Sequence, residues 1–360
     1  MGKSKSTNKN LQMKLTNNTK PSNKTLPTVS VCTPTFNRRP FISTLIKCFD
    51  HQIYPKNLLE WIIIDDGTDH IEDLVKNHPQ VKYFKYDTKM TLGKKRNLMH
   101  EKTTGSIIVY MDDDDYYPPT RVSHAVEMLT KNPDALCAGA SEIYIYFKHI
   151  QKLYQFGPYG PNHATAGTFA FKRQLIHIQK YNEEASLAEE KEFLNDYKIP
   201  FVQLDPKHVI LVFSHIHNTF DKKKLLEGNI NNKYVKESDK SIDYFINEPD
   251  LKHFFMNEIE EALENYEPGR PEMKPDVLLQ MEQIEIKRKK MIESQKQQPN
   301  NKSITVKQGD NPPVQLNHEQ TIRMIQLQQE KIKKLIDENT ALKNMMKNII
   351  KENPEIKYQI

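Results

Sequence analysis

Cysteine is scarce in this sequence, and so are long apolar runs. The three cysteines, Cys32, Cys48 and Cys137, make no even set of disulfides and lack metal-ligand spacing, which suits a reducing compartment. No apolar run approaches the roughly 18 residues that span a bilayer. The first residues hold no apolar core of a signal peptide. These absences predict a soluble, cytoplasmic protein.

Apolar residues are also fewer than in most globular domains. They make up 37% of the chain and charged residues 28%, so we expect part of the chain to lie outside a packed core. Residues 1–27 combine lysines with Ser, Thr and Asn and contain no acid, which predicts a disordered basic arm. The net charge of +5 is modest and the arm has no interleaved aromatics. We therefore expect no nucleic-acid partner.

Four consecutive aspartates stand out against this background. Asp112, Asp113, Asp114 and Asp115 directly follow the apolar run 107–110. Adjacent like charges repel one another, and folding alone gives no reason for them. Such a cluster after a buried strand suits Mg²⁺ or Mn²⁺, which carboxylates hold together with phosphate oxygens of a substrate. The alternative is a solvated acidic turn.

Strands and helices alternate through the first third of the chain. Apolar runs predict strands at 29–32, 61–64, 81–84 and 107–110, and helical spacing predicts helices at 41–49, 92–102 and 119–129. Continuous apolarity in such strands indicates a parallel sheet with both faces covered. Ligands bind beyond the carboxyl ends of the strands in these sheets. Polar motifs at 34–38, 65–67 and 112–115 fall there and predict one shared site.

The remaining chain divides into three parts. In residues 134–220, apolar runs predict strands at 143–147, 168–171 and 209–213, and the spacing predicts a helix around 188–197. An amphipathic helix predicted over 251–263 closes the domain, which we expect to span residues 28–265. Prolines mark 266–315 as a linker with a possible charged helix at 276–294. Residues 316–352 carry apolar heptads. The a positions are Ile325, Ile332, Asn339 and Met346, and the d positions include Leu335, Leu342 and Ile349.

These heptads predict a two-stranded parallel coiled coil and hence a homodimer. A single Asn at the first heptad position specifies that register. The alternative is a lone amphipathic helix that packs on the preceding domain.

Four motifs in a set order resemble the landmarks of glycosyltransferase family 2, inverting enzymes of the GT-A fold. They are residues 31–38, 63–67, 92–97 and 110–115. The resemblance covers residues 28–220. It implies a Rossmann-like α/β fold with a mostly parallel sheet flanked by helices, to which the heptads add a C-terminal helical coiled coil. It also implies a metal-dependent enzyme of the hexosyltransferase type.

This resemblance implies a reaction and its partners. A sugar moves from a nucleotide-sugar donor, expected to be a UDP-sugar, to a hydroxyl of a glycan, protein or lipid acceptor. The cofactor is Mn²⁺ or Mg²⁺. The alternative is a weak or inactive transferase-like scaffold that dimerises through its coiled coil. A sugar-nucleotide pyrophosphorylase is disfavoured because residues 34–37 lack the glycines of its loop.

The nucleotide-binding residues carry over from the first three motifs. Asp66 matches the acid that accepts a hydrogen bond from the base, and Asp65 is a second choice for that role. A plain turn is the alternative. Arg96 and Asn97 match the element beside the diphosphate, where a guanidinium binds phosphate in a bidentate manner. The residues of the first motif that would line the nucleoside pocket are Thr33, Pro34, Thr35, Asn37 and Arg38.

The aspartate run matches the DxD element of the family. Asp112 is expected toward the ribose and also as a metal ligand. Asp114 is expected on the metal, with Asp115 assisting. Asp113 is expected to point away if the chain is extended, because successive side chains then alternate. A register slip of one residue would bring Asp113 and Asp115 into those places instead.

Two further elements complete the expected site. Glu190 matches the catalytic base, which removes the proton of the acceptor hydroxyl, although Glu189 stays open as the alternative. A His after the last strand ligates the metal in many members of the family. His215 is the first choice for this ligand and His217 the second. Residues 157–167 lie where acceptor loops occur but show no readable specificity.

Overall fold

The computed structural model describes residues 25–227, 233–297, 304–306, 314–316 and 318–352. The chain forms two compact units, Met1–Gln283 and Ile284–Ile360. None of the helices within the described ranges is long and apolar enough to cross a membrane.

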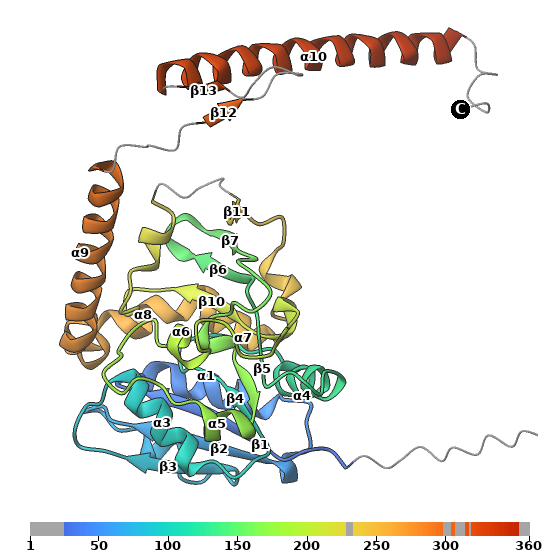
Figure 1. The fold of residues 1–360 in the computed structure, drawn as a ribbon. Helices are drawn as coiled ribbons and strands as arrows, with labels where there is room; N and C mark the ends of the chain where they lie inside the picture. Colours follow the sequence, from blue (N-terminus) through green and yellow to red (C-terminus); the bar gives the residue numbers. More distant parts are fainter. Residues whose placement is uncertain (1–24, 228–232, 298–303, 307–313, 317, 353–360) are drawn as a thin grey trace, which may run out of the picture. The chain divides into compact units, whose positions relative to one another are not determined.

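The first unit is built on a seven-stranded sheet with the order β3-β2-β1-β4-β8-β5-β9. Figure 1 labels β1 to β5 of this sheet. The pairs β3–β2, β2–β1, β1–β4 and β5–β9 are parallel, whereas β8 runs antiparallel to β4 and β5. The strands are β1 (Val29–Thr35), β2 (Leu59–Asp65), β3 (Val81–Lys85), β4 (Ile107–Tyr110), β5 (Cys137–Gly139), β8 (Ala170–Lys172) and β9 (Phe201–Gln203). The predicted α/β class with a mostly parallel sheet is confirmed.

Both faces of this sheet are buried. Trp61 and Ile63 of β2 join one apolar core, while Ile62 and Ile64 join the other. Neighbouring side chains of a strand point to opposite faces, so covering both faces explains why the strand sequences are continuously apolar. The helices of the first core include α1 (Arg39–Asp50) and α4 (Arg121–Lys131), and those of the second include α3 (Leu92–Lys102), α5 (Gln174–Ile178) and α6 (Glu190–Phe193). The short α2 (Glu72–Val75) precedes β3.

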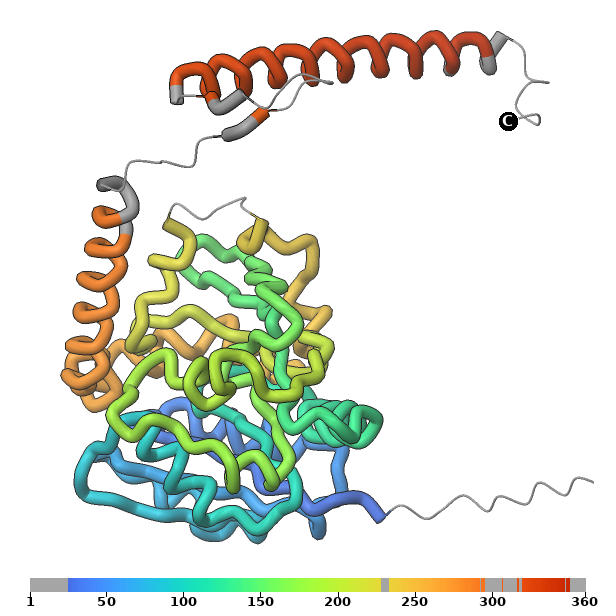
Figure 2. The backbone as a smooth tube through the Cα atoms, in the orientation of Figure 1, coloured from blue at the N-terminus to red at the C-terminus, as the bar shows by residue number. Residues whose placement is uncertain are grey.

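A second, four-stranded sheet has the order β10-β6-β7-β11. It comprises β6 (Ile143–Phe147), β7 (Lys152–Phe156), β10 (Leu211–Ser214) and β11 (Val235–Glu237). Figure 2 shows the blue N-terminal part of the chain at one end of this unit and the green and yellow segments beyond it. The predicted closing helix is present as α7 (Pro249–His253), a π-helical turn at Phe254–Glu258 and α8 (Ile259–Glu264).

The helix predicted at 188–197 is much shorter than expected. Only Glu190–Phe193 are helical, as α6. Ala188 has a φ of 53°, and Asn195, Asp196 and Tyr197 have φ values of 50°, 52° and 61°. Right-handed helices require negative φ, so these left-handed residues end the helix on both sides.

The C-terminal segments are largely helical. α9 (Pro275–Gln297) corresponds to the predicted charged helix and includes residues of both units. The second unit also holds the hairpin β12 (Ile304–Val306) and β13 (Val314–Leu316) and the long helix α10 (His318–Glu352). Heptad side chains of α10 are exposed, for example Ile332 at 53% and Leu335 at 55%. The helix is present, whereas its pairing with a second helix stays a prediction. The predicted basic arm at 1–27 lies almost entirely outside the described residues.

One buried arginine fastens the strand that leads to the aspartate run. Arg121 at the start of α4 is 0% exposed. Its Nη2 donates hydrogen bonds to the carbonyl oxygens of Tyr110, Thr168 and Phe169 at 3.1, 2.9 and 2.7 Å. Burial lowers the pKa of Arg121 to about 10, so the guanidinium is still charged at neutral pH. This contact holds the end of β4 against the segment before β8.

We expect Arg121→Met to lower the free energy of unfolding by roughly 3 kcal/mol, because three buried carbonyl groups lose a charged donor. Chemical denaturation followed by circular dichroism measures this change. Lys131→Met, an exposed position at the other end of α4, is the matched control and should change stability by less than about 0.5 kcal/mol. Equal stability of Arg121→Met and the wild type would contradict the assigned role.

Candidate active site

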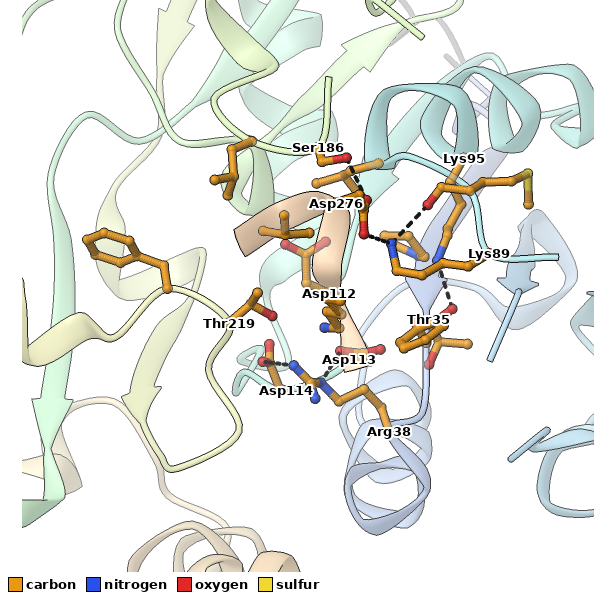
Figure 3. Close-up of a pocket in the computed structure, with 18 of the residues that line it drawn as sticks. Thr35, Arg38, Lys89, Lys95, Asp112, Asp113, Asp114, Ser186, Thr219 and Asp276 are labelled. Carbon is orange, nitrogen blue, oxygen red and sulfur yellow. Dashed lines mark hydrogen bonds and ion pairs between the residues drawn. The ribbon is translucent and has the colours of Figure 1, made fainter. Parts of the chain in front are cut away.

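A pocket of about 350 Å³ lies at the carboxyl ends of β1 and β4 (Figure 3). Its walls come from the loop after β1, the start of α3, the aspartate run, and segments near residues 186, 219 and 275. The lining contains six basic side chains, Arg38, Lys89, Lys95, Arg96, Lys222 and Lys274, and four acidic ones, Asp112, Asp113, Asp114 and Asp276. Two of the predicted polar motifs, 34–38 and 112–115, therefore meet here.

Arg38 links these two motifs. Its guanidinium donates to the carbonyl oxygens of Gly269 and His217, both at 3.0 Å. The same group lies 3.6 Å from a carboxylate oxygen of Asp113 and 3.6 Å from one of Asp114. Figure 3 shows both aspartates facing Arg38. The backbone hydrogen bonds fix the guanidinium beside the acids.

Asp113 does not point away from the site as expected. The expectation assumed an extended chain, whereas residues 113 and 114 form a turn. A turn does not alternate its side chains as a strand does, so Asp112, Asp113 and Asp114 all line the pocket. Asp115 faces β10 instead, where its Oδ1 lies 3.4 Å from the Phe213 amide nitrogen that donates to it.

His215 follows β10 and reaches the aspartate run. Its Nε2 lies 3.3 Å from Oδ2 of Asp114. Asn218 orients the histidine, because its Oδ1 accepts from the backbone N–H of His215 at 2.9 Å and its Nδ2 lies 2.8 Å from Nε2. Burial lowers the pKa of His215 to about 3 despite the nearby carboxylate, so the imidazole is neutral. His217 instead lies beside the Tyr266 ring, 6.1 Å between centroids.

The pKa values of the four aspartates shift in different directions. Burial raises the pKa of Asp112, which Arg96 only partly offsets, and burial and Asp114 raise the pKa of Asp113 to about 7. Burial and Asp114 likewise raise the pKa of Asp115. Burial also acts on Asp114, but its hydrogen bond with His215 and the charge of Arg38 hold its pKa well below the usual range. Asp114 is thus the carboxylate that keeps its charge most firmly.

The donor set around Asp114 fits a divalent cation in part. Across the described residues, no three His, Cys, Asp or Glu side chains gather as a ready metal centre. Asp114 and a neutral His215 do offer two ligand atoms side by side, and Oδ1 of Asp112 is buried without a hydrogen-bond partner among these residues. Cations that bind nucleotides commonly take one or two protein carboxylates and complete their shell with phosphate oxygens. The residues present fit that arrangement.

Arg96 connects the aspartate run with the predicted base element. Its Nε donates to Oε1 of Glu189 at 2.8 Å, and its Nη1 lies 3.7 Å from Oδ1 of Asp112. Its guanidinium also lies 4.5 Å from the centre of the Tyr110 ring. Glu189 is buried and committed to this ion pair. In contrast, burial and the charge of Glu189 raise the pKa of Glu190 to about 7.

Asp65 and Asp66 satisfy partners within the protein. Oδ1 of Asp65 accepts from the Gly67 amide at 3.0 Å, and its Oδ2 accepts from the Ile71 amide at 3.0 Å and from the Tyr83 hydroxyl at 2.8 Å. Asp66 contacts the ammonium of Lys95 and accepts from the Met90 amide at 2.6 Å. Neither carboxylate lines the pocket, although Lys95 does. Asp66 therefore acts on the pocket through the position of Lys95.

Three other predicted residues hold loops in place and do not line the pocket. Thr33 donates to the Met111 carbonyl at 2.7 Å and accepts from the Trp61 indole at 2.9 Å. Asn97 pairs with the backbone of Tyr181 through both ends of its amide, each at 2.9 Å.

Asn37 is the third of these residues, and it has a positive φ of 52°. Its Oδ1 accepts from the amides of Thr68 and Asp69 at 2.8 and 3.0 Å. These bonds join the loop after β1 to the loop after β2. Pro34, Thr35, Arg38 and Arg96, by contrast, reach the pocket lining.

Sequence reasoning missed the wall formed by Lys274, Asp276 and Val277. The surrounding prolines predict a linker here, and no motif marks the segment. Lys89 was missed as well, since a lone lysine before a helix resembles a surface residue. No pattern local to either segment signals the pocket.

Comparison with known proteins identifies a similarity within the first compact unit. Residues 30–189, less than half of the chain, match the family model "Glycosyl transferase family 2". A poly(ribitol-phosphate) beta-N-acetylglucosaminyltransferase, TarS, of Staphylococcus aureus (strain Mu50 / ATCC 700699) is 30% identical over 92 residues. That alignment covers 24% of this chain and only 16% of the relative. The chain therefore matches a small fraction of that protein's length.

Solved structures show a weaker likeness. Staphylococcus aureus TarS 1-349, in complex with UDP-GlcNAc, aligns with 19% identity and a TM-score of 0.42 over 52% of this chain and 58% of that chain. The mannosyltransferase PcManGT of Pyrobaculum calidifontis, in complex with GDP-Man and Mn²⁺, aligns with 15% identity and a TM-score of 0.43 over 68% and 74%. Likeness at this level says nothing about substrate or site residues.

Proposed function

We propose that this chain is an inverting, metal-dependent glycosyltransferase of family 2 that uses a nucleotide-sugar donor, with a UDP-sugar as the expected one. The observation that carries the proposal is the match of residues 30–189 to the family model. It is supported by the gathering of Thr35, Arg38, Arg96 and three of the four aspartates around one pocket. An inactive scaffold is disfavoured, because this pocket keeps its full set of charged groups.

The charges of the pocket support binding of a diphosphate. Its basic side chains outnumber its acidic ones, and a guanidinium gives bidentate recognition of phosphate. Arg38 and Arg96 are both held by other protein groups, so their positions are set before a ligand arrives. Such preorganised charge stabilises the negative charge that grows on a departing diphosphate.

Asp114 and His215 would hold the Mn²⁺ or Mg²⁺ ion, with Asp112 as a further candidate. When bound, the ion supplies Lewis-acid stabilisation of the leaving diphosphate. Glu190 is our choice for the base that takes the proton of the acceptor hydroxyl. Its pKa of about 7 suits proton transfer near neutral pH. Glu189 is less suited, because its carboxylate is already paired with Arg96 at 2.8 Å.

A panel of UDP- and GDP-sugars with Mn²⁺, scored for donor hydrolysis, tests the activity. We expect the wild type to turn over at least one donor. Asp114→Ala should lower that rate by about 10²-fold, because it removes a proposed ligand of the cation that stabilises the leaving diphosphate. Asp239→Ala, whose side chain is 94% exposed, is the control and should keep the wild-type rate. The proposal would be refuted if Asp114→Ala turned over the donor as fast as the wild type, or if the wild type turned over no donor.

The proposed base makes a separate prediction about pH. Only the ionised carboxylate of Glu190 can take a proton, so kcat should rise as pH increases through about 7 and then level off. Glu190→Gln should lower kcat by about 10²- to 10⁴-fold and abolish this limb of the profile. Glu192→Gln, on the exposed side of α6, is the control. A large loss in Glu189→Gln with none in Glu190→Gln would assign the base to Glu189 instead.

We also propose that α10 pairs with a second copy of the chain. Its exposed heptad residues, including Leu335 and Leu342, would be covered by such pairing. Removal of residues 316–360 should convert a dimer into a monomer in multi-angle light scattering. Removal of residues 1–24 should leave the dimer intact. An unchanged mass after the C-terminal truncation would rule out this assignment.

A further inference from the structure

One wall of the pocket comes from a segment beyond the matched region. Residues 267–283 follow the closing helix α8 and still belong to the first compact unit. The carbonyl oxygen of Pro268 accepts from the Asn37 side chain at 2.8 Å, and that of Gly269 accepts from Arg38 at 3.0 Å. The segment thus begins on the loop after β1, and Lys274, which follows it, lines the pocket.

The C-terminal part of this wall is held by hydrogen bonds and an ion pair to other segments of the pocket. Oδ2 of Asp276 accepts from the Ser186 hydroxyl at 2.7 Å, and Oδ1 pairs with the Lys89 ammonium at 2.5 Å. Figure 3 shows Asp276 between these two residues. Gln280 adds two hydrogen bonds, accepting from the Ser186 amide at 2.8 Å and donating to the Glu184 carbonyl at 2.6 Å. Both ends of the wall are therefore anchored by specific contacts.

In the part of the chain that the structure describes, the ammonium of Lys274 lies between these anchors without a polar partner. Among the described residues, the structure gives its ammonium no hydrogen bond and no ion pair within 4 Å. Nζ of Lys274 lies 5.8 Å from the centre of the Phe36 ring, which Lys89 and Lys95 also approach at 5.3 and 5.8 Å. Burial and the charge of Arg38 lower the pKa of Lys274 to about 7.

Removing an ammonium from water without a partner is unfavourable. Nearby Asp113 and Asp114 attract the charge of Lys274, but Arg38 lies closer to both carboxylates and already pairs with them. An anion entering the pocket would supply the missing partner. The negatively charged part of a nucleotide sugar is its diphosphate.

We propose that Lys274 binds the diphosphate of the donor, and that residues 267–283 are an integral wall of the donor site. This inference rests on the proposed function, because it takes a nucleoside diphosphate as the ligand. It adds a phosphate-binding residue that lies outside the matched region 30–189. It also implies that a catalytic fragment ending near residue 265 would lack part of its donor site.

Isothermal titration calorimetry on the full chain with UDP, UMP and uridine tests the inference. A charged hydrogen bond contributes about 1.5–3 kcal/mol, so Lys274→Met should weaken UDP binding by about ten- to a hundredfold. Uridine binding should stay unchanged, since it carries no phosphate, and Lys274→Arg should retain much of the UDP affinity. Lys287→Met, an exposed lysine of α9, is the matched control. Wild-type UDP affinity in Lys274→Met would overturn the inference.

Chemical labelling of the wild type keeps the test independent of any folding defect in the variants. Acetylation of lysines, read by mass spectrometry, should be slowed at Lys274 by UDP but not by uridine, and Lys287 should react equally in both. Equal labelling of Lys274 with and without bound UDP would refute the contact. If the wild type binds neither UDP nor GDP, the proposed function fails. If the wild type binds UDP or GDP but that nucleotide does not slow acetylation of Lys274, only this inference fails.

Discussion

The structure around the pocket depends on how the protein offsets the mutual repulsion of four adjacent carboxylates. Two arginines supply positive charge next to these acids: Arg38 beside Asp113 and Asp114, and Arg96 beside Asp112. Both guanidiniums are themselves fixed by other groups, so the acids meet preset positive charge. Even so, the pKa values of three of the aspartates are raised. This balance of charge supports the proposed binding of a cation together with a diphosphate.

The sheet supplies the rigid base for this charge arrangement. Parallel strands β1 and β4 end side by side, and their loops therefore deliver Arg38 and the aspartates to one place. Arg121 then ties the end of β4 to the segment before β8 through three carbonyl groups. Side chains such as Asp65 and Asn37 fix the loops that carry the pocket lining. These two predicted residues thus hold loops in place and do not line the pocket.

The pocket also includes residues that lie far along the chain from the predicted motifs, in the segment 267–283. Asp276 and Gln280 fasten the wall at 267–283 to the segment near Ser186, which immediately precedes the proposed base. The proposed donor pocket and the segment of the proposed base are therefore held by the same contacts. The domain boundary predicted at 265 stays a prediction, but the compact unit continues to Gln283. This arrangement makes the end of the domain part of its proposed active site.

The sequence by itself determined the α/β class, the order of the strands along the chain and the strand-end positions of the polar motifs. These follow from apolar periodicity, which is a local property. It also pointed to the segment with Glu189 and Glu190, although the helix there is a single turn because left-handed residues flank it. The length of that helix depended on backbone angles that apolar spacing does not reveal.

Only the tertiary structure decided which charged groups face one another. Asp113 enters the pocket because its chain turns there, and Asp66 is directed to Lys95 and not to the pocket lining. Lys274 reaches the site because a distant segment folds back onto the loop after β1, near Arg38. Side-chain direction in a turn and contacts between residues far apart in the chain arise from packing, and no local pattern of residues encodes them.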